Sequence, residues 1–289
     1  MLLTNARAGS VDRQRVDPAV RILEAGGPVE VVVLDSATQL DQVLDERGDR
    51  QVVVAGGDGT VHRVVAALNR RGELGDVELG LIPLGTGNDF ARAAGVPLDV
   101  KEAAKIVLAG RVHSFDLVVD DLGDIAVNNV HLGVGAEASR RGAVWKHRLG
   151  RLGYGLGMLQ ASFVPSFRLD VDIDGERVAG RDRPVLEVSV GNGATVGGGL
   201  PLNPRADPAD GKLDAVVSFA AGPVRRISYG IDLLRGQQLA RPDVMRRSCH
   251  AVTVTGEPFY LSADGEIYGP VRRRAWHLER GAVRLLLGQ

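Results

Sequence analysis

Two glycine-rich turns carry the residues of this chain that are best suited to chemistry. The first, Gly56-Gly57-Asp58-Gly59-Thr60, follows the β-branched run Val52-Val53-Val54, and the second, Gly85-Thr86-Gly87-Asn88-Asp89, follows the apolar stretch from Leu79 to Leu84. We expect each turn to connect a buried strand to the start of a helix. Backbone N–H groups at a helix N-terminus, together with the helix dipole, attract anions. The two turns therefore predict a phosphate site.

Asp58 adds a carboxylate to the first of these turns. A carboxylate beside a phosphate would repel it, so the pair makes most sense with a metal ion between them. In the second turn, Thr86 and Asn88 offer short polar side chains that can form hydrogen bonds. One such turn alone could be an ordinary strand-to-helix connection, but two at the ends of neighbouring strands would line one crevice. We therefore expect a nucleotide polyphosphate with Mg²⁺.

The elements that must position these turns change character along the chain. Over residues 1–115, strand and helix patterns alternate, which predicts an α/β domain with a parallel sheet. Over residues 116–289, short strands that alternate apolar and polar residues predict a β-sandwich-like domain with helical insertions at 140–163 and 224–239. The last strand could pack on either domain. The strands expected from Phe115 onward are residues 115–119, 124–131, 167–173, 185–190, 213–219, 252–255 and 282–287.

Composition excludes several classes of protein. No apolar run reaches the roughly 18 to 20 residues that are needed to span a bilayer. The N-terminus lacks the basic and apolar segments of a signal peptide, so a cytoplasmic location is the default expectation. The single cysteine, Cys249, excludes an intramolecular disulfide. A formal net charge of −1 argues against a general nucleic-acid binder.

The two turns and several later motifs resemble the catalytic domain of the diacylglycerol kinase family. Soluble bacterial lipid kinases are the most similar members, and sphingosine and ceramide kinases are more distant. The resemblance covers nearly the whole chain in order, although the first glycine motif also occurs in NAD kinases and phosphofructokinases. The later motifs are Gly191-Asn192-Gly193, Gly197-Gly198-Gly199, the run from Pro204 to Asp214, and Asp264-Gly265-Glu266.

This resemblance implies a reaction and the residues that perform it. The γ-phosphoryl group of ATP would pass, with Mg²⁺ present, to a lipid hydroxyl, with diacylglycerol as the first candidate acceptor, in a cleft between the two domains. Such a transfer needs a carboxylate that orients the hydroxyl and accepts its proton. By resemblance Asp264 is that base, Glu266 supports it, and Asp58 places the metal. The residues implied to hold the nucleotide are Asn5, Gly9, Gly56, Gly57, Gly59, Thr60, Gly85, Thr86, Gly87 and Asn88.

The resemblance also implies two metal sites. Asp58, Asp89 and Asp116 match acidic positions of a water-mediated network around the catalytic Mg²⁺. The side chains of Asp207 and Asp210 and the carbonyl of Lys212 match a second, structural Mg²⁺ site. Alternatives remain for single residues. Asp89 could be only a helix N-cap, Asp116 only an exposed carboxylate at a domain junction, and Asp264-Gly265 only a common hairpin turn.

A lipid acceptor would bring the protein to a membrane surface. We expect a transient, peripheral contact there, and exposed edge strands in the second domain would permit a homodimer. The basic run from Arg140 to Arg151 precedes an apolar stretch, Leu152 to Phe163. Such a segment could lie on an anionic membrane, or it could be a solvated helix face whose other side packs on the core.

Four positions depart from the pattern of the family, and two rival functions stay open. Ala6 replaces a proline, Ser10 replaces a basic residue, and His62 and Arg63 stand where Asn and Glu are usual. A kinase for a soluble substrate such as NAD is the first rival, because it would share the first glycine turn. A non-catalytic lipid-binding module that descends from a kinase is the second, because of the departures at Ala6, Ser10 and Arg63.

Overall fold

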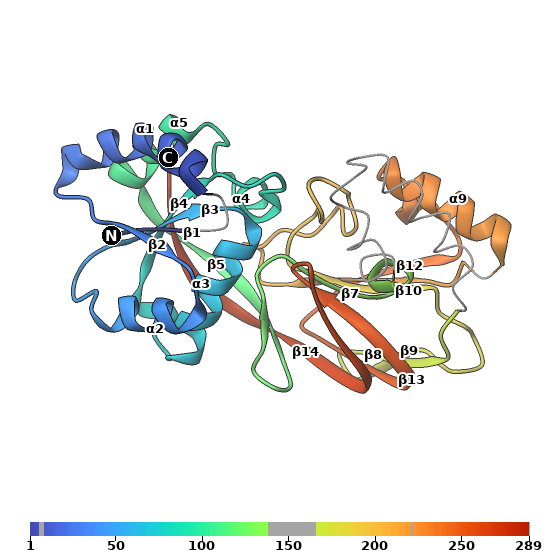
Figure 1. Cartoon of the computed structure of the whole chain (residues 1–289). Helices are drawn as coiled ribbons and strands as arrows, with labels where there is room; N and C mark the ends of the chain where they lie inside the picture. The colour runs from blue at the N-terminus through green and yellow to red at the C-terminus, as the bar shows by residue number, and fades with distance from the viewer. Residues whose placement is uncertain (6–8, 138–165, 221, 289) are drawn as a thin grey trace. The chain divides into compact units, whose positions relative to one another are not determined.

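The computed structural model describes residues 1–5, 9–137, 166–220 and 222–288, and they form two compact units (Figure 1). Unit 1 comprises Met1–Leu117, Pro208–Gly211 and Glu279–Gln289. Unit 2 comprises Val118–Asp207 and Lys212–Leu278. Strands β5 (Arg111–Asp120) and β14 (Glu266–Leu287) each contribute residues to both units.

Unit 1 is built on a parallel sheet with the strand order β14-β4-β3-β1-β2. Its central strand β3 is buried along its whole length, which explains the continuous apolar run from Val52 to Ala55. The end of β14 joins this sheet because Arg284 and Leu285 pair with Glu78 and Leu79. The other strands are β1 (Leu2–Asn5), β2 (Val31–Leu34), β3 (Val52–Gly56) and β4 (Glu78–Pro83).

Helices cover both faces of this sheet (Figure 1). Helices α1 and α5 pack together on one face, and α2 and α3 lie together on the other. Side-chain caps define two of the starts: Ser36 accepts from the backbone N–H of Gln39, and Asp99 accepts from those of Lys101 and Glu102. The helices are α1 (Gly9–Leu23), α2 (Ala37–Asp45), α3 (Asp58–Arg70), α4 (Asp89–Ala93) and α5 (Val100–Ala109), with 3-10 turns at Glu24–Gly26 and Leu74–Asp76.

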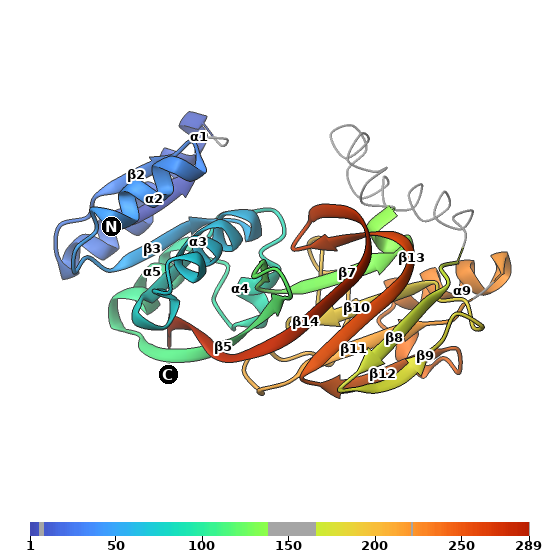
Figure 2. The same cartoon turned by 90° about the horizontal axis from the view of Figure 1, so that it is seen from below.

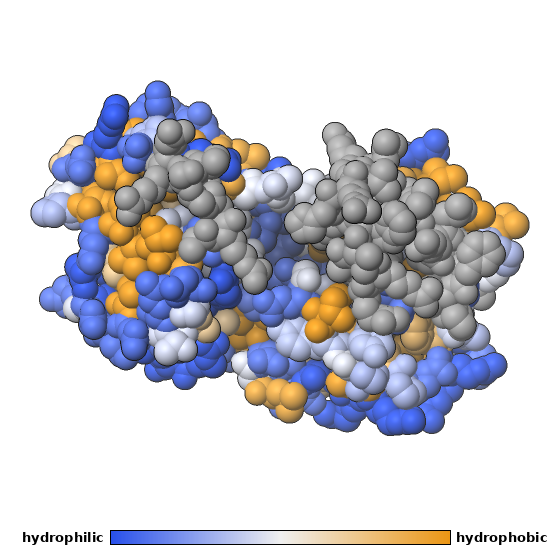
Figure 3. Space-filling view, in the orientation of Figure 1, coloured by the Kyte–Doolittle hydropathy of each residue, from blue (hydrophilic) through white to orange (hydrophobic). Residues whose placement is uncertain are grey.

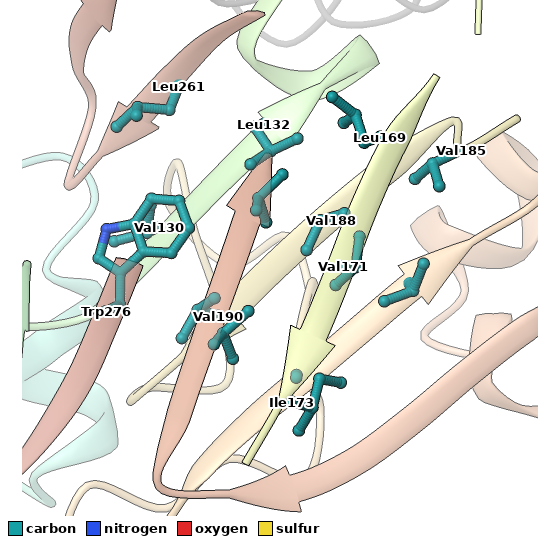
Figure 4. Packing of buried hydrophobic residues seen from close by; sticks show 14 of the residues in the cluster. Val130, Leu132, Leu169, Val171, Ile173, Val185, Val188, Val190, Leu261 and Trp276 are labelled. Atoms are coloured by element: carbon teal, nitrogen blue, oxygen red, sulfur yellow. The ribbon is translucent and has the colours of Figure 1, made fainter. Parts of the chain in front are cut away.

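Unit 2 consists of antiparallel strands in the order β12-β11-β10-β7-β13-β14, with β8 on β13, β9 on β8, and β6 on β5. Alternating residues of β7, β8, β10 and β11 enclose one apolar core. Figure 4 shows Leu169, Val171 and Ile173 of β8 in the same cluster as Val188 and Val190 of β10. The strands are β6 (Ile125–Ala126), β7 (Asn129–Gly133), β8 (Leu169–Ile173), β9 (Glu176–Ala179), β10 (Glu187–Gly191), β11 (Leu213–Ser218), β12 (Val244–Cys249) and β13 (Ala251–Ala263).

Strand β13 belongs to both layers around this core (Figure 2). Its first half, Val252 to Gly256, pairs with β8, and its second half, Leu261 to Ala263, pairs with β7. The register with β14 shifts between Thr255 and Phe259. Such an irregularity bends a strand and increases its twist, so β13 can leave one layer and continue in the other. This bend makes unit 2 sandwich-like.

Helix α9 (Pro223–Leu234) lies against the other face of this sheet, on β10 and β12 (Figure 1). Tyr229 and Leu233 pack with Leu186 in a second apolar cluster. The Tyr229 hydroxyl donates to Oε2 of Glu187 at 3.0 Å. Burial raises the pKa of Glu187 to about 7 and raises the pKa of Tyr229 well above its ordinary value. Helix α9 therefore packs against the buried carboxyl group of Glu187.

The predicted fold class is confirmed: an α/β part with a parallel sheet is followed by a sandwich-like β part. Two strands that the sequence did not predict are present, β9 and β12, and the last strand is far longer than residues 282–287. The expected helix at 224–239 ends at Leu234 and is followed by a 3-10 turn at Gln238–Ala240. The expected helix at 140–163 lies outside the described residues. Within the described ranges, no helix is long and apolar enough to cross a membrane.

The buried Glu187 predicts a pH-dependent stability. Its pKa is about 7 in the folded chain and 4.5 in the reference state, so the folded state retains a proton that the unfolded state releases. The contribution of Glu187 to the free energy of unfolding is therefore fully present below the pKa that Glu187 has in the unfolded chain. It is lost as the pH rises through the pKa of Glu187 in the folded chain, by about 3 kcal/mol in total. Glu187→Gln removes this loss and still accepts from Tyr229. Denaturant unfolding should show the variant gaining about 3 kcal/mol on the wild type between acidic and mildly alkaline pH.

Comparing the wild type with Glu187→Gln separates the effect of Glu187 from that of a second buried group, His131. Burial lowers the pKa of His131 to about 4, so that residue reduces stability as pH falls. His131 is present in both proteins, so its contribution largely cancels in their difference. A difference that stays constant over the pH range would contradict the assignment to Glu187.

Candidate active site

The two glycine-rich turns lie in direct backbone contact. Strands β3 and β4 are parallel neighbours, with Gly56 opposite Pro83. A Cβ atom added to Gly57 would lie 2.8 Å from the Cα of Gly85, and one added to Gly85 would lie 2.5 Å from the Cα of Gly57. No larger residue fits at either position without moving the backbone. The structure thus brings together the two turns that the sequence singled out.

Asn88 shapes the second turn from within. Its backbone is left-handed, with φ of 54°, a conformation that asparagine tolerates better than most residues. Its Oδ1 accepts from the N–H of Gly85 at 2.9 Å, and its Nδ2 donates to the carbonyl of Gly85 at 2.8 Å. The side chain of Arg92 donates to the carbonyl of Gly87. Asn88 therefore contributes to the turn's shape, while Thr86 is exposed at its surface.

The first turn contains glycines of two kinds. At Gly56, a Cβ atom would lie 2.6 Å from the Cβ of the buried Thr60, so packing within the chain requires glycine. At Gly59, which is exposed in the first turn of α3, an added Cβ would have nothing within 4 Å and the φ is not left-handed. The chain's own packing does not require Gly59. Its open space, at a helix whose N-cap Gly57 offers no capping side chain, fits the approach of a phosphate.

Asp58 in the first turn and Asp89 in the second have different environments. The half-buried Asp58 accepts from the backbone N–H of Phe90 at 3.1 Å and so connects the first turn to α4. Asp89 is buried, with Arg92 at 3.7 Å. The alternative that Asp89 is the N-cap of α4 is wrong, because Asn88 occupies that position. Mg²⁺ bound with a nucleotide takes one or two carboxylates besides phosphate oxygens and water, and Asp58 fits that role.

Asp116 is buried and connects three segments of unit 1, so it is not an exposed junction residue. Its Oδ2 accepts from the N–H of Gly211 at 2.7 Å, and its Oδ1 accepts from that of Gly281 at 2.8 Å. Its own N–H donates to the carbonyl of Pro208 at 2.7 Å. The carboxylate predicted for the catalytic metal thus holds part of the loop that was predicted for the second metal.

The structure leaves the two predicted metal sites as predictions. Asp207, Asp210 and Lys212 are all exposed. Over the described ranges of the chain, no three His, Cys, Asp or Glu side chains form a group that could hold a metal ion. Asp58, Asp89 and Asp116 do not form such a group either.

Asp264 is firmly anchored in unit 2. It has a left-handed backbone, φ 48°, in the turn between β13 and β14. Its Oδ2 accepts from the N–H of Val127 at 2.7 Å, and its Oδ1 accepts from those of Asn128 and Asn129 at 3.0 and 3.1 Å. Three charge-assisted hydrogen bonds fix the orientation of this carboxylate. Glu266 is exposed and accepts from the Tyr268 hydroxyl at 3.0 Å.

The Gly191-Asn192-Gly193 motif supports this anchor. The fully buried Asn192 donates through Nδ2 to the carbonyl of Val127 at 2.8 Å, and its backbone N–H donates to the carbonyl of Asn128 at 2.9 Å. At Gly191 a Cβ would lie 2.5 Å from the side chain of Asn203. The motif therefore holds the loop whose N–H groups bind Asp264. Its position in the sequence gave no sign of this connection.

His131 is a second neighbour of Asp264 that sequence reasoning missed. It lies on β7 opposite Ser262 and is buried. Burial lowers the pKa of His131 to about 4, and the charge of Asp264 opposes this shift. The imidazole is therefore neutral at physiological pH. A single histidine in an alternating strand carries no signal that could have identified it.

A second Asp-Gly-Glu turn in unit 2 has almost the same geometry. Asp174 also has φ of 48°, and its Oδ1 accepts from the N–H groups of His250 and Ala251 at 2.9 and 2.8 Å. Glu176, however, forms an ion pair with Arg247. The tripeptide is thus a structural turn in one place and a candidate site in the other. Asp174 provides a matched control for Asp264.

Comparison with known proteins places these features in a family. The description “Diacylglycerol kinase catalytic domain” matches residues 1–119, and “YegS C-terminal NAD kinase beta sandwich-like domain” matches residues 128–287. The “Probable lipid kinase YegS-like” protein of Stenotrophomonas maltophilia is 32% identical over 95% of this chain and 88% of its own length. The chain belongs to the diacylglycerol kinase catalytic domain family. The family expected from the motifs is confirmed.

Further relatives agree with this assignment. “Diacylglycerol kinase” of Mycobacterium tuberculosis is 31% identical over 84% of this chain and 79% of its own length. A crystal structure of a diacylglycerol kinase from Bacillus anthracis superimposes with a TM-score of 0.75 at 24% identity, covering 99% of this chain and 96% of that one. That likeness establishes the shared fold.

The structure shows the surroundings of two of the four positions at which this lipid kinase homologue departs from the family pattern, His62 and Arg63. The Arg63 side chain folds back on its own helix, where Nε donates to the carbonyl of Gly59 at 3.1 Å. His62 is buried. Asn5 ends β1 and Gly9 begins α1, but Ala6 lies outside the described residues, as does the side chain of Ser10. Arg63 therefore lies against the first turn of α3.

The two kinds of glycine predict opposite effects of adding a methyl group. Gly85→Ala forces a contact of 2.5 Å with the Cα of Gly57 and one of 2.7 Å with Oδ1 of Asn88. We expect it to lower the free energy of unfolding by about 1–3 kcal/mol. Gly59→Ala meets open space in a helix and should leave stability unchanged or raise it by up to about 1 kcal/mol. Urea unfolding measures both. Equal losses in the two variants would contradict the packing argument.

Proposed function

We propose that this protein transfers the γ-phosphoryl group of ATP, with Mg²⁺, to the hydroxyl of a lipid, with diacylglycerol as the first acceptor to test. The contact of Gly57 with Gly85, beside the open space at Gly59, is the observation that carries the proposal. Membership in the diacylglycerol kinase catalytic domain family supports it.

The residues of unit 1 would hold the triphosphate. Backbone N–H groups at the start of α3 and in the second turn, where Thr86 is exposed, would provide donors for phosphate oxygens. Because Gly59 carries no Cβ, phosphate can approach the helix closely. Asp58 would contact the metal directly or through water. Bound Mg²⁺ supplies charge neutralisation for the transferring phosphoryl group.

The residues of unit 2 would act on the acceptor. Asp264 would orient the lipid hydroxyl and take its proton as the oxygen attacks the γ-phosphorus and ADP leaves. The three N–H donors around Asp264 hold the carboxylate in one orientation, which such a step requires. His131, neutral at physiological pH, would add no positive charge beside it. The lipid lies in a bilayer, so the protein would meet a membrane surface transiently.

A soluble acceptor is the second candidate. The description that matches residues 128–287 names an NAD kinase-like sandwich, and the first glycine turn is shared with that class. NAD therefore belongs in the same assay as the lipids.

The assay measures transfer of label from γ-labelled ATP to lipid alcohols in mixed micelles and to NAD. We expect label on a lipid, a rate at least about 100-fold lower in Asp264→Asn, and a nearly wild-type rate in Asp174→Asn. Both substitutions remove a carboxylate that accepts backbone N–H groups in an Asp-Gly-Glu turn. Only the first would remove the base.

Two further measurements keep folding separate from chemistry. Asp264→Asn should retain binding of a fluorescent ATP analogue, because Asp264 is not among the residues proposed to hold the nucleotide. Gly59→Ala should lose that binding while it stays folded, because its methyl group occupies the space proposed for phosphate. Equal losses of activity in Asp264→Asn and Asp174→Asn would refute the base assignment. Label on NAD alone would establish the second candidate.

A further inference from the structure

Helix α9 exposes a continuous apolar stripe. Val224, Ile227, Ile231 and Leu234 recur at intervals of three and four residues, which places them along one side of a helix. Their exposed fractions are 78%, 48%, 43% and 57%, respectively. Figure 3 shows apolar surface gathered over this helix. Monomeric proteins rarely leave a contiguous apolar surface of this kind without a partner.

The opposite side of the helix is fixed to unit 2, so the stripe cannot turn inward. Tyr229, Gly230 and Leu233 are buried. Tyr229 donates to Glu187, and the guanidinium of Arg226 donates to Ser166 at 2.8 Å. The stripe is therefore a fixed surface of unit 2.

The charge around the stripe is positive. Arg225 and Arg235 are exposed at the two ends of the helix. The pKa of Asp243 is lowered by Arg241 and, to a smaller extent, by Arg225. The acid on the helix, Asp232, pairs with Arg241 at 2.7 Å, and Arg241 also pairs with Asp243. A pocket of about 570 Å³ beside the helix is lined by Arg183, Arg225 and Arg241 together with Asp232 and Asp243. Arginine side chains beside a bilayer surface attract anionic headgroups.

We propose that α9 is a docking surface for an anionic lipid bilayer. The stripe from Val224 to Leu234 enters the boundary between headgroups and acyl chains, and Arg225 and Arg235 contact lipid phosphates. The inference deepens the proposed function, because a lipid acceptor is the reason for the protein to reach a bilayer. It assigns the contact to a helix outside both glycine turns and the Asp264 loop.

Charge argues against two other occupants of this surface, a second copy of the chain and residues 138–165 of the same chain. A second copy of the chain packed symmetrically through α9 would bring arginines against arginines. Residues 138–165 carry five arginines and lysines and no acidic residue, so they offer no counter-charge to Arg225 and Arg235. An anionic bilayer complements both the apolar stripe and the charge.

Co-sedimentation with vesicles tests the proposal on the full chain. The probes are vesicles of phosphatidylcholine alone and of phosphatidylcholine mixed with phosphatidylserine. We expect binding to the mixed vesicles and a partition coefficient at least about tenfold lower in Ile227→Asp and in Ile231→Asp. Leu122→Asp is the matched control, because Leu122 is a 73% exposed residue of unit 2 outside α9, and should bind as the wild type does. Arg225→Gln with Arg235→Gln should remove the preference for phosphatidylserine.

A kinase assay separates this proposal from the proposed function. With a short-chain diacylglycerol dissolved as monomers, Ile227→Asp should keep the wild-type rate, and with the same acceptor class in vesicles it should lose most of it. If neither protein phosphorylates any lipid but the variant still loses vesicle binding, the docking surface stands and the proposed function fails.

Three results would overturn the docking surface. The first is equal vesicle binding by the wild type, Ile227→Asp and Leu122→Asp. The second is a wild-type dimer in sedimentation velocity that Ile227→Asp converts to a monomer, which would assign the stripe to a second copy. The third is a drop of several degrees in the Tm of Ile227→Asp but not of Leu122→Asp, which would mean that the chain itself covers the stripe.

Discussion

The backbone contact between Gly57 and Gly85 is the constraint on which the candidate nucleotide site depends. Two chain segments approach so closely there that a single methyl group on either would collide with the other's Cα. The parallel pairing of β3 and β4 brings the turns to the same edge of the sheet, and Asn88 holds the second turn in the shape that allows the contact. Gly59 is different, because open space rather than packing surrounds it. The first motif thus contains two glycines that the packing of the chain requires, Gly56 and Gly57, and one, Gly59, whose lack of a side chain would be explained by a bound phosphate.

Carboxylates that accept backbone N–H groups are the second recurrent device. Asp58 accepts from α4, Asp116 accepts from Gly211 and Gly281, and Asp264 accepts from three successive residues. Charge-assisted bonds of this kind are stronger than neutral ones. Each acid therefore organises its loop, apart from any chemistry that is proposed for it. Substitution of such a residue can reduce activity either by disturbing the loop or by removing a chemical group. The Asp174 turn is a useful reference because a substitution there disturbs a loop without removing the proposed base.

The architecture could be predicted from the sequence where periodicity was strong. The buried run before Gly56 and the alternation in Leu169 to Ile173 distinguished parallel from antiparallel strands, because the first is covered on two faces and the second on one. Strands β9 and β12 were missed because their residues are partly exposed and lack that alternation. The length of β14 was missed because its apolar pattern is interrupted by a run of arginines, Arg272 to Arg274, although pairing with β13 continues through it.

The sequence by itself determined the family, the order of α/β and β parts, and the glycine turns, because these depend on residue types at short spacing. Only the tertiary structure decided which backbone groups each acidic residue holds. Two Asp-Gly-Glu turns look alike in the sequence and even share their backbone geometry, but one is held by the Val127–Asn129 loop and the other by residues 250 and 251. Likewise His131, Asn192 and the outward stripe of α9 acquire meaning only from burial and from distant partners. Local propensity acts over a few residues, whereas a site is formed by contacts between residues more than a hundred positions apart.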